Sequence, residues 1–195
     1  MTCDIVLAGV GGQGVLSIAA IIAGAAMAEG LKVRQSEVHG MAQRGGAVSA
    51  HLRISDSPIR CDLIASGGAD MILSMEPVES LRYIYFLKPD GVIVTAAEAF
   101  VNIPDYPDLG LIVKAIEGQP RSRVIAAAEL ARKAGSARAV NMVMVGAASP
   151  FIPVGQADIE ASIARLFGSK DSSVVEANLK AFAAGVVAVA TDAGR

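Results

Sequence analysis

Residues 4–14 read DIVLAGVGGQG, a short apolar run followed by a turn that contains four glycines. The apolar residues are typical of a buried strand, and this strand stops at Gly9. Residues 15–29 indicate a helix that is apolar almost all round and therefore covered on more than one side. Residues 31–38 follow as a second strand. Strand, glycine turn, helix and strand form a βαβ unit, whose right-handed crossover predicts two parallel strands.

The next segment alternates with the period of a strand. Val48, Ala50, Leu52 and Ile54 fall on one face, and Ser49, His51 and Arg53 fall on the other. Residues 59–64 are predicted as its hairpin partner, which makes the sheet mixed. Further strands are expected at 70–75, 92–95 and 123–127, a turn at 88–91, irregular chain at 102–108, and helices at 77–87, 128–133, 141–148, 157–167 and 173–190. The pattern predicts one three-layer α/β/α domain over residues 1–195, with a mostly parallel, Rossmann-like sheet.

Composition limits the classes of partner. Apolar residues make up 53% of the chain but aromatic residues only 4%, so Ala, Val, Ile, Leu and Met must fill the core. Charged residues are only 18%, which suggests a surface covered by an oligomer or a partner subunit; an alanine-rich α/β protein explains the same value. The net charge of −2 and the scattered basic residues argue against nucleic acid. The chain shows no secretory signal and no predicted membrane span, so we expect a cytoplasmic protein.

The glycine turn is suited to an anion. Gly9 allows a sharp exit from the strand, Gly11 and Gly12 let the backbone approach a ligand, and Gly14 lets the helix pack closely. The first helix amides lack intrahelical acceptors, so a phosphate can accept hydrogen bonds from them, with Gln13 adding a side-chain amide. The alternative is a tight turn that serves packing alone.

A second polar loop begins at the end of the second strand, where ligands sit in open α/β sheets. Residues 37–46 read EVHGMAQRGG. Glu37 stands where a Rossmann protein places its ribose-binding carboxylate, although a solvated glutamate fits as well. His39, Gln43 and Arg44 are predicted to face the same crevice as the glycine turn, beside Gly45 and Gly46, and Arg44 could clamp a phosphate. No residues have the spacing of metal ligands or of a nucleophile with its base, so we predict no catalytic or metal-binding residue in this chain.

Together the two loops resemble the gamma-type subunits of 2-oxoacid:ferredoxin oxidoreductases. The form HGMAQRGG at residues 39–46 is most similar to the beta subunit of the indolepyruvate enzymes. The resemblance covers nearly the whole chain, and it also rests on His51, Arg53, Ala69, Asp70, Glu76, Pro77, Asn141 and residues 87–91 and 178–182. It implies the fold of the third domain of pyruvate-ferredoxin oxidoreductases.

The resemblance also implies a division of labour. Enzymes of this family oxidatively decarboxylate a 2-oxoacid to an acyl-CoA and pass electrons to ferredoxin. Thiamine diphosphate and the iron–sulfur clusters are then expected on a large partner subunit, through which ferredoxin is reached. This chain agrees, because Cys3 and Cys61 are too few for a cluster and no GDG-type thiamine motif occurs. Coenzyme A is the co-substrate expected near residues 11–14, and the isolated chain is expected to be inactive.

Two other functions remain compatible with the sequence. One is a free-standing oxidoreductase that binds NAD or FAD, which the GxGxxG spacing at residues 9–14 and Glu37 favour. The other is a structural or homo-oligomeric α/β protein whose glycine turn serves packing only. Co-purification with a large thiamine-dependent subunit would separate the subunit hypothesis from both.

Overall fold

The computed structural model of the chain describes residues 1–39, 45–101 and 105–192. Its strands are β1 (Thr2–Val10), β2 (Lys32–His39), β3 (Ala47–Ser55), β4 (Ala69–Ser74), β5 (Leu87–Ala96) and β6 (Ser122–Ile125). Its helices are α1 (Val15–Ala28), α2 (Pro77–Arg82), α3 (Leu109–Glu117), α4 (Ala127–Lys133), α5 (Val140–Ala148), α6 (Gln156–Phe167) and α7 (Ser172–Asp192), with short 3-10 turns η1 (Ile84–Phe86) and η2 (Ser149–Phe151).

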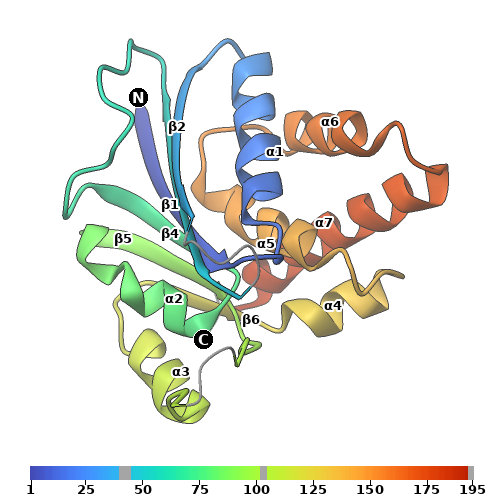
Figure 1. Cartoon of the computed structure of the whole chain (residues 1–195). Coiled ribbons are helices and arrows are strands. Elements are labelled where there is room, and N and C mark those ends of the chain that lie inside the picture. Colours follow the sequence, from blue (N-terminus) through green and yellow to red (C-terminus); the bar gives the residue numbers. More distant parts are fainter. Residues whose placement is uncertain (40–44, 102–104, 193–195) are drawn as a thin grey trace.

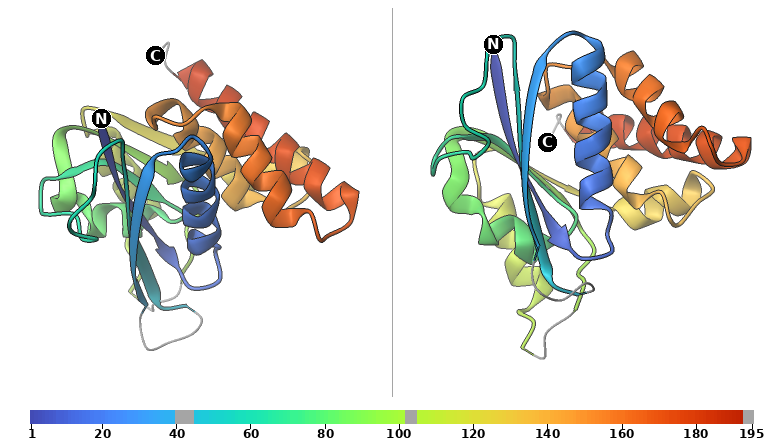
Figure 2. Two further views of the ribbon diagram at one scale, coloured as in Figure 1. Left: turned by 90° about the horizontal axis from the view of Figure 1, so that it is seen from above. Right: turned by 45° about the horizontal axis from the view of Figure 1, so that its top comes forward.

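The strands form one sheet in the order β2-β3-β1-β4-β5-β6 (Figure 1). β3 is antiparallel to both of its neighbours, β2 and β1, whereas β1, β4, β5 and β6 are parallel to one another. Helices cover both faces (Figure 2): α1, α4, α5, α6 and α7 lie on one side, and α2 and α3 lie on the other. The predicted three-layer architecture with a mixed, mostly parallel sheet is therefore confirmed.

The predicted parallel direction of β1 and β2 is confirmed, but several other local predictions were wrong. β1 and β2 run in the same direction, but β3 lies between them, because the alternating segment pairs with both strands. Residues 59–64 form no strand and are not its hairpin partner. The helix predicted over 77–87 ends at Arg82 and gives way to η1. Residues 88–91 are not a separate turn; they belong to β5, as an irregularity in its pairing with β4. α3 was not predicted.

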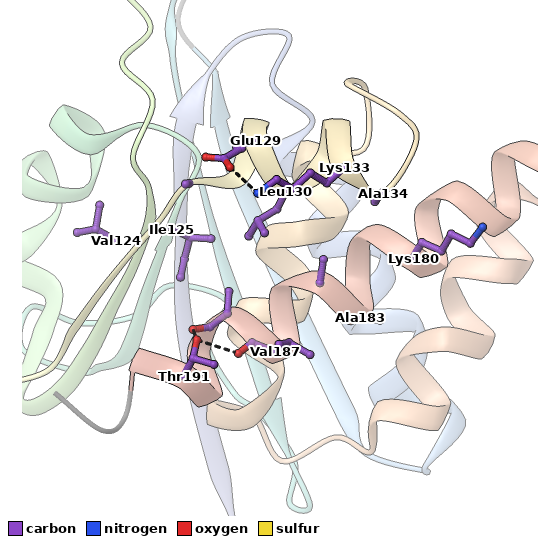
Figure 3. A pocket seen from close by; sticks show the side chains of 13 residues that line it. Val124, Ile125, Glu129, Leu130, Lys133, Ala134, Lys180, Ala183, Val187 and Thr191 are labelled. Atoms are coloured by element: carbon purple, nitrogen blue, oxygen red, sulfur yellow. Dashed lines mark hydrogen bonds and ion pairs between the residues drawn. The ribbon is translucent and has the colours of Figure 1, made fainter.

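An apolar surface lies at the β6 edge of the sheet. There β6, α4 and α7 enclose a groove of about 790 Å³ whose walls include Leu130, Ala183 and Val187 (Figure 3). Val187 remains 61% exposed. Within the described residues, the segment Ser172–Thr191 of α7 is long and apolar enough to cross a membrane, by length and composition only. Apolar surface of this kind is typical of a face that another protein covers.

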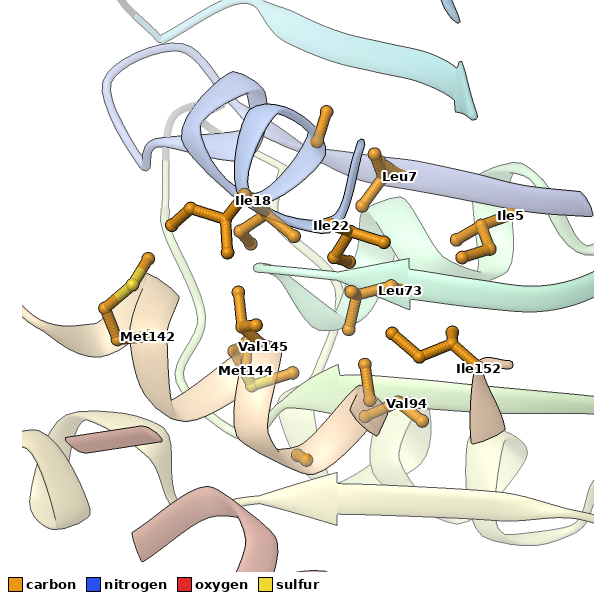
Figure 4. Close-up of a cluster of buried hydrophobic side chains, with 14 of the residues drawn as sticks. Ile5, Leu7, Ile18, Ile22, Leu73, Val94, Met142, Met144, Val145 and Ile152 are labelled. Carbon is orange, nitrogen blue, oxygen red and sulfur yellow. The ribbon is translucent and has the colours of Figure 1, made fainter. Parts of the chain in front are cut away.

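The core on the α1 side is built from aliphatic residues and methionine. Ile5 and Leu7 of β1 and Leu73 of β4 pack against Ile18 and Ile22 of α1, above the buried methionines of α5 (Figure 4). The opposite face of the same strands forms a smaller cluster with α2 and α3. Because β1 and β4 are buried on both faces, they read as continuous apolar runs. The expectation of an aliphatic core is confirmed, although Phe182 is its largest fully buried side chain.

Helices α7 and α5 pack in close contact at two glycines. A Cβ on Gly146 of α5 would overlap the carbonyl oxygen of Phe182. A Cβ on Gly185 of α7 would in turn overlap the carbonyl oxygen of Val143. The two helices therefore touch backbone to backbone, and each position accepts only glycine in this packing.

Candidate functional site

The glycine turn joins the end of β1 to the start of α1. Gly12 has φ 101° and Gly14 has φ 81°, both in the left-handed region that side chains with a Cβ disfavour. At Gly9 the constraint is space rather than φ, because a Cβ would come within 2.8 Å of the Val15 side chain. The sequence therefore needs glycine at these positions to leave the strand and begin the helix at once.

The Gln13 side chain closes this turn from inside. Its Oε1 accepts a hydrogen bond from the backbone N–H of Val10 at 2.7 Å, and its Nε2 donates to the carbonyl oxygen of Met75 at 3.2 Å. Gln13 thus ties the end of β1 to the residue that follows β4. The side chain therefore holds the turn in shape, and the contact with an anion that the sequence suggested for it stays a prediction.

The start of α1 keeps backbone donors without a helical acceptor. Helical hydrogen bonding begins with the N–H of Ser17, which donates to the Gly14 carbonyl at 3.0 Å. The amides of Val15 and Leu16 come before this bond, and none of the described side chains caps the helix. These amides and the helix dipole together favour a negatively charged group at this end.

A cavity of about 420 Å³ lies beside this helix start. Residues at the starts of three helices line it, namely Gly14 directly before α1, Ala128 in the first turn of α4, and Asn141 in the first turn of α5. Arg138 supplies the guanidinium group in this wall. A Cβ on Gly14 would lie 2.8 Å from Nδ2 of Asn141, so the glycine and the amide side chain are in close contact. Beside the start of α1, the cavity can therefore offer an anion a side-chain amide and a cation.

Glu98 lines the same cavity from the chain that follows β5. Its Oε1 accepts a hydrogen bond from the N–H of Ala128 at 2.8 Å, at the first turn of α4. Its Oε2 is buried and has no hydrogen-bond partner within the part of the chain that the structure describes. No sequence pattern points to Glu98, because a single carboxylate after a strand belongs to no motif.

The second glycine loop meets the first, as predicted. The N–H of Gly11 donates to the Gly46 carbonyl at 2.8 Å, and the N–H of Gly45 approaches the Gly11 carbonyl at 3.5 Å. Val10 at the end of β1 pairs directly with Ala47 at the start of β3. The two loops therefore share one edge of the sheet. Gln43 and Arg44 lie outside the described residues.

Glu37 and His39 lie on the outermost strand, β2, where they pair with Ala50 and Val48 of β3. Because β3 separates β2 from β1, Glu37 stands two strands, roughly 10 Å, from the glycine turn. A Rossmann protein places the strand that carries the ribose-binding carboxylate beside its first strand. Insertion of β3 removes that arrangement here.

The face of β3 that carries His51 and Arg53 is closed by the protein itself. Arg53 binds both carboxylate oxygens of Asp4, at 2.8 and 3.0 Å. Nδ1 of His51 accepts a hydrogen bond from the N–H of Ile64 at 2.9 Å, and its ring packs edge-on against Phe86. Burial lowers the pKa of His51, and the charge of Arg53 adds to this. Both side chains therefore hold the segment after β3 against the sheet.

Neither cysteine belongs to a cluster of ligands. Cys3 is buried on β1, where burial above all raises the pKa of its thiol to about 12. Cys61 is exposed, in the segment between β3 and β4. Among the described residues, no three His, Cys, Asp or Glu side chains form a group that could hold a metal ion.

Comparisons with known proteins give the family. A family model described as pyruvate ferredoxin/flavodoxin oxidoreductase matches residues 4–188. The chain belongs to this family. The chain is 40% identical to indolepyruvate oxidoreductase subunit IorB of Archaeoglobus fulgidus over 194 residues, which cover 95% of this chain and 94% of that protein. The corresponding subunit of Pyrococcus horikoshii is 38% identical over 195 residues, with 95% of each chain covered.

Solved structures agree with this family assignment. The gamma subunit of a keto/oxoacid ferredoxin oxidoreductase from Geobacter sulfurreducens has a TM-score of 0.73 at 25% identity, with 97% of this chain and 99% of that chain covered. A 2-oxoglutarate:ferredoxin oxidoreductase from Magnetococcus marinus, solved with 2-oxoglutarate, coenzyme A and succinyl-CoA bound, has a TM-score of 0.78 at 23% identity. This chain is 97% covered there but spans only 31% of that longer chain. The predicted resemblance is confirmed: the chain is a small subunit of a 2-oxoacid:ferredoxin oxidoreductase.

Proposed function

We propose that this chain is the subunit without clusters in an indolepyruvate-type, cytoplasmic ferredoxin oxidoreductase, and that the start of α1 binds a phosphate of coenzyme A. The single observation that supports the phosphate site most is the first turn of α1, without a side-chain cap among the described residues, beside a cavity of about 420 Å³. Pockets of this size are typical of small-ligand sites. The residues in contact would be Gly12, Gly14 and Asn141, with Arg138 as the cation.

The proposed reaction converts a 2-oxoacid and coenzyme A to an acyl-CoA and carbon dioxide, with two electrons passed to ferredoxin. Thiamine diphosphate and the iron–sulfur clusters supply the decarboxylation and electron-transfer chemistry when bound to the large subunit. The residues of this chain do not fit a cluster, because one of its two cysteines is buried in the core and the other is exposed elsewhere. Its own contribution is to bind and orient coenzyme A and to contact that subunit.

The loop formed by residues 39–46 completes this proposal. The sequence placed Gln43 and Arg44 beside the glycine turn, and Gly46, shortly after them in the chain, accepts a hydrogen bond from Gly11. We therefore assign them to the same phosphate-binding region. Glu37 lies two strands from the glycine turn and suits a contact with the large subunit better, whereas His39 ends β2 at the same edge of the sheet as the glycine turn.

The partner surface proposed for the large subunit includes the groove between β6, α4 and α7. Its walls are largely apolar, and α7 leaves apolar side chains such as Val187 in solvent. Burial of this surface in a complex is favourable because it removes apolar area from water. We propose no nucleic-acid or membrane partner, and α7 acts as a packing helix on α5.

The phosphate site is tested with the assembled complex, which is obtained by co-expressing this chain with its large subunit. Calorimetric titration with coenzyme A compares the wild type with Gly12→Asp. Because Gly12 has open space around it, the substitution adds a negative charge near the anion with little crowding. We expect affinity to fall at least tenfold.

Gly30→Asp is the matched control. Gly30 also has positive φ, 82°, and open space, but it lies at the opposite end of α1. It therefore carries the same charge and a similar backbone strain at a distance from the cavity. Equal coenzyme A affinity in the wild type and Gly12→Asp, or equal losses in both variants, would contradict the phosphate site.

The choice of substrate is tested separately. Ferredoxin reduction by the assembled complex is measured with indolepyruvate and with 2-oxoglutarate at the same concentration. Faster reduction with indolepyruvate is expected from the relatives named above. Faster reduction with 2-oxoglutarate would overturn the assignment of substrate but leave the phosphate site intact.

A dinucleotide oxidoreductase is the weaker alternative. It would need a carboxylate beside the glycine turn, and β3 separates Glu37 from that turn. A bound flavin would give the purified protein a visible absorbance band, and that result would favour the alternative.

A further inference from the structure

One carboxylate oxygen of Glu98 has a hydrogen-bond partner, and the other has none among the described residues. Oε1 accepts from the N–H of Ala128 and so satisfies an orphan donor at the start of α4. Oε2 is buried without a partner among the described residues. A buried polar atom of this kind is rare and costly, because it has lost its water without gaining a protein donor. Capping of α4 needs only one of the two oxygens.

The lining of the cavity has two chemically different parts, a set of hydrogen-bond donors and one acceptor. Gly12, Gly14, Asn141 and Arg138 offer hydrogen-bond donors and positive charge, which suit a phosphate. Glu98 offers only an acceptor with negative charge, which repels a phosphate. One ligand that contacts both parts must carry an anionic group and, separately, a neutral N–H or O–H group.

We propose that the Glu98 carboxylate turns on ligand binding, so that Oε2, buried and without a partner among the described residues of the free protein, accepts a hydrogen bond from an uncharged N–H or O–H group of the ligand whose phosphate binds at the start of α1. Glu98 then selects phosphorylated ligands that carry an amide, amine or hydroxyl over simple phosphates. This inference rests on the proposed phosphate site. Coenzyme A meets the requirement, because it joins phosphates to amide, amino and hydroxyl groups in one molecule.

The test uses the assembled complex and two probes, coenzyme A and inorganic pyrophosphate. Glu98→Gln keeps the size of the side chain and an oxygen that can cap Ala128, but it replaces Oε2 by an amide that donates. The ligand donor then faces a second donor. We expect Glu98→Gln to bind coenzyme A at least tenfold more weakly and to bind pyrophosphate with unchanged or greater affinity. Glu98→Asp, which is too short to reach both partners, should show the same loss for coenzyme A.

The outcomes separate this inference from the proposed phosphate site. Gly12→Asp should weaken both probes, because both carry the anion. If Gly12→Asp weakens both probes while the Glu98 variants bind coenzyme A as the wild type does, the phosphate site stands and the role of Glu98 is wrong. If the Glu98 variants weaken both probes equally, Glu98 only shapes the cavity, which also overturns the inference. If neither probe binds the wild type, both proposals fall.

Thermal unfolding of the variants completes the test. A midpoint for Glu98→Gln close to that of the wild type shows that the cap on α4 is intact. If Glu98→Gln does not fold, the binding measurement with Glu98→Asp decides the question by the same criteria.

Discussion

Two neighbouring parallel strands, β1 and β4, each end in a turn and a helix at the same edge of the sheet, yet the two helix starts differ in chemistry. After β1 the turn consists of glycines, and no described side chain caps α1. After β4 the turn carries Glu76, whose Oε2 accepts from the N–H of Glu79 at 2.9 Å and caps α2. One helix start is filled by the protein's own carboxylate, and the other has no side-chain cap among the described residues, which is where we propose that an anion binds.

Glu76 also fixes the chain around the candidate site. Its Oε1 accepts from the N–H of Phe100 at 3.3 Å and from the hydroxyl of Tyr106. Burial and the hydrogen bond to Glu76 raise the pKa of Tyr106, which therefore stays protonated and donates. Phe100 lines the cavity beside the glycine turn. Glu76 at the start of α2 thus holds in place Phe100, which forms part of the wall of the cavity beside α1.

The largest expected effect on stability comes from removing the Glu76 carboxylate that caps α2. Glu76→Leu leaves the donors of Glu79, Phe100 and Tyr106 without their acceptor, and Glu76 is only 1% exposed. A buried unpaired donor costs about 1–3 kcal/mol, and the part-buried donors of Phe100 and Tyr106 cost less, so we expect the free energy of unfolding to fall by roughly 3–5 kcal/mol. Urea denaturation measures this change. The exposed Glu129→Gln is the control and should leave the urea midpoint unchanged; an unchanged midpoint in Glu76→Leu would contradict the role of the cap.

Crowding the start of α1 should have the next largest effect. Gly14→Ala places a Cβ at positive φ and 2.8 Å from Nδ2 of Asn141, which we expect to cost about 1–3 kcal/mol of unfolding free energy. Gly30→Ala has the same kind of φ but open space, so its cost should be smaller. The difference between the two variants measures the crowding. It should shrink in an Asn141→Ala background, and equal losses at both glycines would show that Asn141 is not in close contact.

Loosening the glycine turn should cost less than either change. Gln13→Ala removes the acceptor of the Val10 N–H and the donor to the Met75 carbonyl. We expect a loss of about 1–2 kcal/mol of unfolding free energy and weaker coenzyme A binding, since the turn no longer holds its shape. Gln13→Glu keeps the acceptor for Val10 and is the comparison variant. A stability equal to that of the wild type in Gln13→Ala would mean that the glycines alone fix the turn.

The smallest effect concerns the closed face of β3 and depends on pH. The pKa of His51 lies below its ordinary value of 6.5 in the folded protein, so folding favours the neutral ring. The stability from this neutral ring is complete above about pH 6.5 and is lost as the pH falls toward the folded pKa. Denaturation midpoints between pH 7 and pH 5 should therefore show a shallow decline that His51→Asn reduces. An identical decline in both proteins would assign it to other groups.

The sequence predicted those parts of the fold that depend on local pattern. The glycines at 12 and 14 fixed the first turn, and alternation in β3 correctly placed Val48, Ala50, Leu52 and Ile54 in the core. The strand order was not predictable in the same way. Any strand with one apolar face can pair at several places, and only tertiary packing placed β3 between β1 and β2.

The candidate site was predictable only where glycines marked it. Glu76 had one signal, since Pro77 at the first helical position makes the preceding residue the N-cap, but glutamate is not a preferred N-cap residue. Glu98 and Arg138 lie far from the glycine turn in sequence, and the fold alone brings them to one cavity. Periodicity cannot reveal such convergence, because it describes one segment at a time.

The two glycines that join α5 to α7 have a consequence for the complex. Side chains that interdigitate can adjust by changing rotamer, but two main chains in contact have no such freedom. The position of α7 along the axis of α5 is therefore fixed by the two backbones, and it does not depend on the rotamers of the surrounding side chains. Asn141 begins the same α5 that Gly146 locks to α7. A force applied to α7 by another protein would thus displace α5 as a rigid body, and with it the wall that Asn141 contributes to the cavity beside the glycine turn.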